Sequence, residues 1–225
     1  MKEQKSKLPE RSYKFFKPIL GLIFRIHYNP KIIGKENIPK EGAIIVAGNH
    51  MHVMDQCGPI LASKRPIHYM AKKEYFDGKF AWFFKMMGCI SVNRSIHDEK
   101  AKEEAINVLL DEKALGIFPE GTRNKTDAFL LPFKFGCVSM AKKTDAYIVP
   151  FAVTGTYKFR SSDLVYRIGK PFKVTNMELE EANKKLEKVI RDLKNKNLSE
   201  ERKKKWTRKS LCLGEEREWV TFFVG

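Results

Sequence analysis

The stretch GNHMHVMDQ, residues 48–56, follows an apolar run, residues 43–47, that is typical of a buried strand. It places His50 and Asp55 five positions apart, just past the end of that strand. If the chain turns into a helix there, Asp55 can hold one ring nitrogen of His50 and leave the other as a base near neutral pH. The same pattern also fits an ordinary strand-to-helix loop in which Asp55 caps the helix.

The charge of the chain points to an anionic partner. Its 43 Lys and Arg residues outnumber 27 Asp and Glu residues, which gives a net charge of +16. Such an excess suits nucleic acid, an anionic membrane surface, a phosphorylated substrate or an acidic carrier. No helix-turn-helix, zinc-finger or RNP pattern occurs, so we expect no nucleic-acid partner. Four scattered cysteines without a C-x-x-C pair indicate reduced thiols rather than a zinc site.

Residues 13–28 mix aromatic and aliphatic side chains with cations. They fall short of the roughly 18–20 apolar residues that a membrane span needs, so we expect peripheral membrane contact. As a helix the segment would suit the bilayer interface, with Lys14, Lys17 and Arg25 near lipid headgroups. A helix that simply covers the core is the alternative. Pro18 is expected to limit a continuous helix to one side of itself.

Strand-like runs alternate with helix-like segments along the rest of the chain. This predicts an α/β fold: a single layered domain with a mixed, mostly parallel sheet flanked by helices, preceded by an N-terminal interfacial helical segment. We therefore expect a basic and aromatic membrane-interface segment over residues 1–33 and the domain over residues 34–200. Residues 201–225 form a basic and apolar tail whose structure the sequence leaves open.

Local signals refine this expectation. Asp98 is a good N-cap for a helix that runs to about residue 113. Thr175 and Glu178 have the spacing of a capping box at the start of the last helix. The aromatic and Met-rich residues 80–87 are expected to line the core.

The second strong signal is FPEGTR, residues 118–123, which directly follows another strand-like run. Gly121 permits a turn or a close backbone approach. Thr122 and Arg123 supply a hydroxyl, an amide and a guanidinium fork that together suit a phosphate. Glu120 could hold the arginine or bind a substrate hydroxyl. A plain turn with a surface arginine is the alternative for this motif taken alone.

Four blocks occur in order along the chain. They are NH-x4-D at Asn49, His50 and Asp55, G-x-x-x-V-x-R at Gly88, Val92 and Arg94, FPEGTR at residues 118–123, and VP-x-x-x-x-G at Val149, Pro150 and Gly155. With these blocks the sequence resembles the glycerolipid acyltransferase family, especially its bacterial 1-acyl-sn-glycerol-3-phosphate (lysophosphatidate) acyltransferases. The resemblance covers about residues 34–171.

The resemblance implies a reaction and a site. An acyl chain would pass from acyl-CoA or acyl carrier protein to the free hydroxyl of 1-acyl-sn-glycerol 3-phosphate, giving phosphatidate in phospholipid biosynthesis, without a cofactor. His50 would act as general base and Asp55 would orient it, as in a Ser-His-Asp triad. The residues implied in acceptor binding are Arg94, Glu120, Gly121, Thr122 and Arg123.

Some choices stay open. Glycerol 3-phosphate or another lysophospholipid would use the same residues as acceptor, and a non-catalytic basic protein that binds membranes or nucleic acid is a more distant possibility. His52 beside His50 could suggest a metal site, but a metal on His50 would block its use as a base, so we expect none. The expected location is the cytoplasmic face of the membrane, bound peripherally.

Overall fold

A single seven-stranded sheet organises the chain. The computed structural model describes residues 10–222 apart from residues 94 and 97, and its strand order is β1-β7-β6-β2-β5-β3-β4. The strands are β1 (Lys31–Ile33), β2 (Ile44–Gly48), β3 (Ile67–Lys72), β4 (Ile90–Val92), β5 (Ala114–Ile117), β6 (Tyr147–Thr154) and β7 (Val165–Ile168). Every neighbouring pair is parallel except β6 and β7, which are antiparallel. The predicted mixed, mostly parallel sheet is confirmed.

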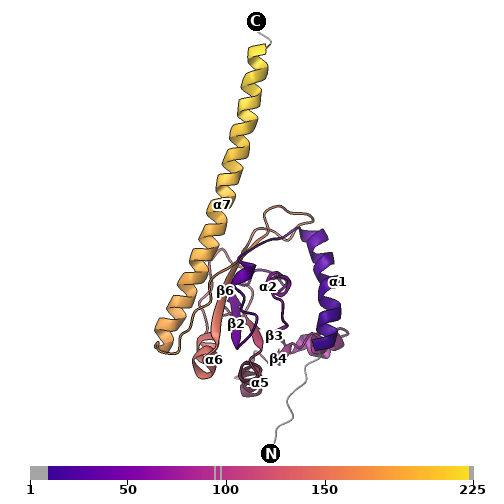
Figure 1. Ribbon diagram of the computed structural model, residues 1–225, viewed down its shortest axis with the longest axis vertical. Helices are drawn as coiled ribbons and strands as arrows, with labels where there is room; N and C mark the ends of the chain where they lie inside the picture. The colour runs from indigo at the N-terminus through magenta and orange to yellow at the C-terminus, as the bar shows by residue number, and fades with distance from the viewer. Residues whose placement is uncertain (1–9, 94, 97, 223–225) are drawn as a thin grey trace, which may run out of the picture.

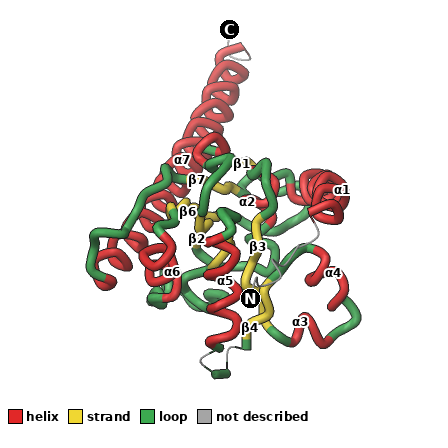
Figure 2. Tube along the Cα trace, turned by 60° about the horizontal axis from the view of Figure 1, so that its bottom comes forward, coloured by secondary structure: helices red, strands yellow, loops and turns green. Residues whose placement is uncertain are grey.

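Helices cover both faces of this sheet (Figures 1 and 2). They are α1 (Glu10–Tyr28), the 3-10 turn η1 (Lys35–Asn37), α2 (Cys57–Ala62), α3 (Glu74–Asp77), α4 (Ala81–Met86), α5 (Glu99–Leu110), α6 (Gly136–Thr144) and α7 (Leu179–Phe222). Buried side chains of α5, α6 and α7 form one core cluster with one face of the strands. Side chains of α1 and α2 form the second cluster on the opposite face. The layered α/β architecture predicted from the alternation of elements is therefore confirmed.

Strand β2 lies at the centre of this arrangement and determines where a site can form. All five of its residues are buried, because Ile45 and Ala47 join one core cluster while Ile44 and Val46 join the other. It pairs in parallel with β5 on one side and β6 on the other. The carboxyl ends of these three strands therefore meet at one edge of the sheet, where ligands bind in open α/β sheets.

Helix α1 packs on the domain with one face and leaves the other uncovered. Tyr13 and Phe24 are buried, whereas the apolar side chains of the outer face are exposed: Phe15, Ile19, Leu22, Ile23 and Ile26. The expectation that Pro18 would limit the helix is wrong, because α1 continues through it. Pro18 and Lys14, whose carbonyl would have bonded the missing N–H, are both exposed, so water can replace that bond.

Residues 74–86 form a small arm between β3 and the edge strand β4 (Figure 2). The side chains of Phe80 and Trp82 are 69% and 56% exposed, so the expectation that they line the core is wrong for these two residues. Within the arm, Tyr75 and Phe84 stack with ring centroids 5.1 Å apart. Apolar composition alone did not distinguish this arm from the core, because α3 and α4 are too short to present a regular apolar stripe.

The caps and the last helix show where local sequence signals hold. The prediction for Asp98 is confirmed, since its Oδ1 accepts the N–H of Ala101 at 3.0 Å. The predicted capping box is wrong: the Thr175 hydroxyl donates to Asp145 at 2.6 Å, and α7 begins only at Leu179. Helix α7 then continues past residue 200, where the tail was expected to begin, and extends beyond the sheet (Figure 1). Among the described residues, no helix combines the length and the apolarity that a membrane crossing needs.

Candidate active site

The turn between β2 and α2 brings His50 and Asp55 into direct contact. Asp55 is fully buried, and its Oδ2 accepts the ring Nδ1–H of His50 at 2.8 Å. The same oxygen accepts the backbone N–H of Met51 at 2.6 Å and of His52 at 2.7 Å. Helix α2 starts at Cys57 with Gln56 as its N-cap residue, so the alternative of Asp55 as an ordinary helix cap is wrong. Asp55 holds both the imidazole and the shape of the turn.

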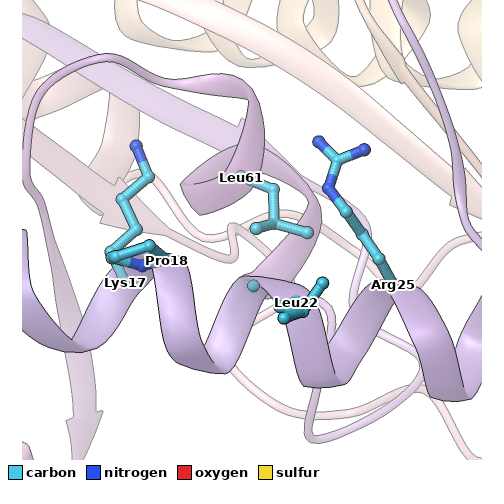
Figure 3. Close-up of a pocket in the computed structure, with 6 residues that line it drawn as sticks. Lys17, Pro18, Leu22, Arg25 and Leu61 are labelled. Atoms are coloured by element: carbon cyan, nitrogen blue, oxygen red, sulfur yellow. The ribbon is translucent and has the colours of Figure 1, made fainter.

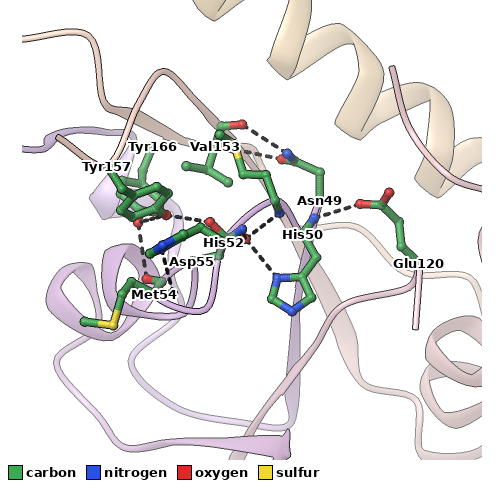
Figure 4. Close-up of polar contacts among 10 residues, drawn as sticks. Asn49, His50, His52, Met54, Asp55, Glu120, Val153, Tyr157 and Tyr166 are labelled. Carbon is green, nitrogen blue, oxygen red and sulfur yellow. Dashed lines mark hydrogen bonds and ion pairs between the residues drawn. The ribbon is translucent and has the colours of Figure 1, made fainter. Parts of the chain in front are cut away.

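This contact sets the chemistry that His50 can perform. An ionised carboxylate can only accept, so Nδ1 carries the proton and the lone pair of the neutral ring lies on Nε2. The ring is held flat against Phe118, with centroids 3.9 Å apart and planes inclined by 10°. In Figure 4 the second ring nitrogen of His50 points away from Asp55. The arrangement gives a base of fixed tautomer and fixed orientation.

The turn after β5 is bonded to both polar backbone atoms of His50. The Oε1 atom of Glu120 accepts the His50 N–H at 2.7 Å, and the His50 carbonyl accepts the N–H of Asn124 at 2.7 Å. The other carboxylate oxygen of Glu120 accepts the N–H of Leu131 at 2.8 Å. Glu120 is 3% exposed, and burial raises the pKa of its carboxyl group. Both of its oxygens are therefore engaged by backbone groups within the protein.

Two cations lie on this turn, and neither makes an ion pair or a side-chain hydrogen bond with another residue that the structure describes. Gly121 has φ +68°, and a Cβ there would lie 2.8 Å from Cε of Lys134, so the lysine side chain lies directly over the turn. Arg123 is half-buried and Thr122 is exposed. The sequence predicted no function for Lys134, because this residue lies outside the four blocks. Arg123 and Lys134 are both placed to meet an anion.

Helix α7 holds the far side of the same turn. The Lys194 ammonium donates to the Phe129 carbonyl at 2.5 Å and lies 4.3 Å from the centre of the Phe129 ring. The Asn183 amide donates to the Phe133 carbonyl at 3.0 Å. These bonds fix the segment that presents Leu131 to Glu120 and Lys134 to Gly121.

Strand β6 and the loop after it complete the site. The side-chain amide of Asn49 donates to the Val153 carbonyl at 3.0 Å, and its oxygen accepts the Val153 N–H at 2.8 Å. Beyond β6, the hydroxyl of Tyr157 donates to Oδ1 of Asp55 and contacts the hydroxyl of Tyr166 at 2.6 Å (Figure 4). The sequence reasoning missed both tyrosines, since neither belongs to a recognisable motif.

The predicted site residues are thus brought together in part. His50, Asp55, Glu120, Gly121, Thr122 and Arg123 meet at the carboxyl edge of β2 and β5. Arg94 lies outside the described residues, so its prediction stays as made. Within the described part of the chain, no three His, Cys, Asp or Glu side chains are grouped closely enough to hold a metal ion.

Comparisons with known proteins bear on the family and the fold. A sequence model of the Acyltransferase family matches residues 29–154. A 1-acyl-sn-glycerol-3-phosphate acyltransferase of Borreliella burgdorferi is 34% identical over 61% of this chain, and one of Bacillus subtilis is 29% identical over 71%. The match spans 56% of the Borreliella protein and 81% of the Bacillus protein. The crystal structure of the 1-acyl-sn-glycerophosphate acyltransferase PlsC from Thermotoga maritima shares the fold, with a TM-score of 0.68 at 24% identity over 81% of this chain and 80% of that one.

Proposed function

Because the chain belongs to the Acyltransferase family, whose model covers more than half of it, we propose that it transfers an acyl chain from a thioester to the free hydroxyl of 1-acyl-sn-glycerol 3-phosphate. The product would be phosphatidate. The observation that carries the proposal is the buried His50–Asp55 pair beside two cations, Arg123 and Lys134, that have no partner among the described residues. The named activity of the relatives supports the choice of acceptor.

The reaction needs a base and no protein nucleophile. Nε2 of His50 takes the proton from the acceptor hydroxyl as its oxygen attacks the thioester carbonyl. The C–O bond forms and the C–S bond breaks, and the protonated His50 returns its proton to the leaving thiolate. Asp55 stabilises the imidazolium that exists between these two proton transfers, as the carboxylate does in a Ser-His-Asp triad.

Arg123 and Lys134 are the described residues best placed to bind the phosphate of the acceptor. A phosphate prefers a guanidinium fork and a point charge in a partly dry site, and both side chains lie at the turn that is bonded to His50. The implied role of Arg94 adds a third cation to this set. For Glu120 the geometry favours a different role from acceptor binding, because both of its oxygens already hold backbone N–H groups. We propose that Glu120 acts through His50.

The lipid acceptor requires access to a membrane, and α1 supplies a suitable surface. Its outer apolar face, residues 15–26, lies opposite the face that packs on the domain. The exposed aromatics Phe80 and Trp82 lie in the arm on the same side of the molecule (Figures 1 and 2). We propose that these two surfaces rest on the anionic cytoplasmic face of the membrane, peripherally bound.

The cations of α1 divide between the protein and the proposed interface. Figure 3 shows the groove between α1 and α2, where Lys17 and Arg25 flank Leu61. The Lys17 ammonium donates to the Ser63 carbonyl, and burial lowers its pKa. Lys17 therefore helps to fasten α1 to the domain. Arg25 and Lys14 are both exposed, and neither side chain makes a bond to a described residue, so these two cations of α1 are available to a lipid headgroup.

The donor is proposed to be acyl-CoA or acyl carrier protein, since both are acidic and the chain carries a net charge of +16. Thiol release measured with each donor, in the presence and absence of lysophosphatidate, tests the proposal. We expect release that depends on lysophosphatidate with at least one donor. Release that depends on glycerol 3-phosphate instead would reassign the acceptor, and no acceptor-dependent release with either donor would reject the function.

A further inference from the structure

Both oxygens of the Asp55 carboxylate accept hydrogen bonds, but only one of them accepts from the turn that carries His50. Its Oδ2 accepts three N–H groups from His50, Met51 and His52, while its Oδ1 accepts a single hydroxyl from Tyr157. Tyr157 comes from the loop between β6 and β7, far from Asp55 in the sequence. We propose that Tyr157 is a positioning residue that fixes Asp55, and through it the orientation and basicity of His50.

The direction of the hydrogen bonds follows from the atoms present. The Asp55 carboxylate can only accept hydrogen bonds, so the single proton of the Tyr157 hydroxyl is donated to Oδ1. The contact between the two phenols, 2.6 Å long, must then be a donation from Tyr166 to the oxygen of Tyr157. Burial raises the pKa of both hydroxyl groups, so both keep their protons. The resulting order is Tyr166 to Tyr157 to Asp55 to His50.

Packing holds both rings in place. The Tyr157 ring stacks on His52 with centroids 4.1 Å apart and meets the edge of Tyr28 at 5.5 Å. Tyr166 is fully buried, and its ring lies so close to α2 that a Cβ on Gly58 would come within 2.1 Å of it. Neither hydroxyl can leave without a shift of a packed ring, and a network of this kind specifies one arrangement when all its members are satisfied.

The consequence concerns the charge that His50 faces. A hydrogen bond to Oδ1 draws part of the carboxylate charge away from the oxygen that faces the imidazole. Without it, the charge concentrates on Oδ2 and favours the protonated, inactive form of His50. The other titratable groups packed around the pair are Glu120 after β5, His52 on the turn itself, Cys57 at the start of α2, Tyr69 on β3 and Tyr166 on β7. Burial raises the pKa of Cys57, Tyr69 and Tyr166, so these three stay neutral near pH 7.

The test compares three variants that each remove one hydroxyl and keep the ring. Tyr157→Phe should lower kcat about 10- to 100-fold, because it removes a hydrogen bond to a charged group, while KM for either substrate changes less than about twofold. Tyr166→Phe keeps the bond to Asp55 and should lower kcat by less. The matched control is Tyr28→Phe, whose hydroxyl bonds no described residue, and it should leave kcat unchanged.

The pH dependence of kcat/KM distinguishes a positioning role of Tyr157 from a mere loosening of the loop between β6 and β7. With Tyr157→Phe, the acid limb of kcat/KM should move to higher pH, so part of the lost activity returns as the pH is raised. A loss that is equal at every pH overturns the proposal, as does a kcat within about twofold of wild type. A rise in KM for the acceptor with unchanged kcat would make Tyr157 an acceptor contact and overturn it too.

A second readout does not depend on turnover. The proposal rests on the proposed acyl transfer only for its kinetics, since the tautomer of His50 can be read from nitrogen chemical shifts in ¹⁵N-histidine-labelled protein. The wild type should show the Nδ1–H form, and Tyr157→Phe should raise the fraction of imidazolium at the same pH. An unchanged histidine spectrum in the variant overturns the role of Tyr157. The absence of wild-type acyl transfer would instead reject the function and leave this measurement intact.

Discussion

The buried carboxylate of Glu120 accepts the backbone N–H of His50 at 2.7 Å, which ties the turn after β5 to the turn after β2. The two strands are parallel neighbours, so the ends that carry these turns lie side by side. The turn that carries His50 and the turn that carries Arg123 are therefore parts of one bonded unit, in which a change to one reaches the other.

Replacing Glu120 by Gln should lower turnover without weakening acceptor binding. One oxygen of the amide can still accept, but its NH2 group meets a backbone N–H, so one of the two bonds to His50 and Leu131 is lost. We expect kcat to fall about tenfold, the cost of one bond to a charged group. Steady-state kinetics with varied lysophosphatidate checks this: a raised KM with unchanged kcat would show that Glu120 touches the acceptor.

The same substitution should make the folded protein more stable relative to wild type as the pH rises. Burial raises the pKa of Glu120 above its ordinary value of 4.5, so the folded protein favours the protonated form. The stability linked to that proton is present at low pH and is lost as the pH rises through the raised pKa. Glu120→Gln cannot ionise, so its melting temperature should gain on that of the wild type as the pH rises above 4.5. A difference that is constant with pH would contradict the burial argument.

His50→Ala and Asp55→Asn should each reduce acyl transfer about 10⁴-fold, by analogy with the loss of the orienting carboxylate in a Ser-His-Asp triad. The first removes the base, and the second favours the wrong tautomer. Glu103→Gln, at an exposed carboxylate on α5, is the control and should keep activity within a few-fold of wild type. Circular dichroism must show that the variants are folded. Activity of His50→Ala near the wild-type value would reject the base assignment.

Arg123→Ala and Lys134→Ala should chiefly raise KM for the phosphorylated acceptor. Removal of one cation from a phosphate site costs about 1.5–3 kcal/mol, the strength of a bond to a charged group. Lys125→Ala removes the same charge from an exposed position on the same turn and should have little effect. If instead the KM of the acyl donor rises and that of the acceptor does not, the cations serve the donor.

Polar substitutions on the outer face of α1 and on the arm should weaken membrane binding. Leu22→Gln with Ile26→Gln, or Phe80→Ser with Trp82→Ser, changes exposed side chains and leaves the core intact. Each pair should reduce sedimentation with anionic liposomes. Leu110→Gln on α5 alters a side chain that is 63% exposed elsewhere and should not. Unchanged binding by both pairs would place the membrane contact on another surface.

The sequence predicted the contact between His50 and Asp55 and the fold, because both depend on local patterns. An apolar run followed by a histidine and an aspartate five positions apart describes β2 and its turn almost completely. Strand and helix alternation likewise predicts a layered sheet. The role of Glu120 was less accessible, since its partner Leu131 depends on how the following loop folds back.

Contacts between distant segments could not be predicted in this way. Tyr157 reaches Asp55 from the loop that joins the antiparallel strands β6 and β7, and no local pattern indicated where that loop would lie. The exposure of Phe80 and Trp82 also depends on the arm leaving the sheet edge. The same types of apolar residue occur in a core and on a lipid-facing surface, so only the three-dimensional structure distinguishes the two.

The position of β1 in the sheet has a consequence for how the protein is made. This strand follows α1 directly, yet it pairs with β7, which the ribosome delivers only near the end of the domain. Long-range pairing of this kind slows folding, because a large loop must close before its contacts form. The outer apolar face of α1 is therefore synthesised well before the sheet can be completed. A nascent chain can contact a bilayer or a chaperone through this face while the rest of the domain is still being synthesised.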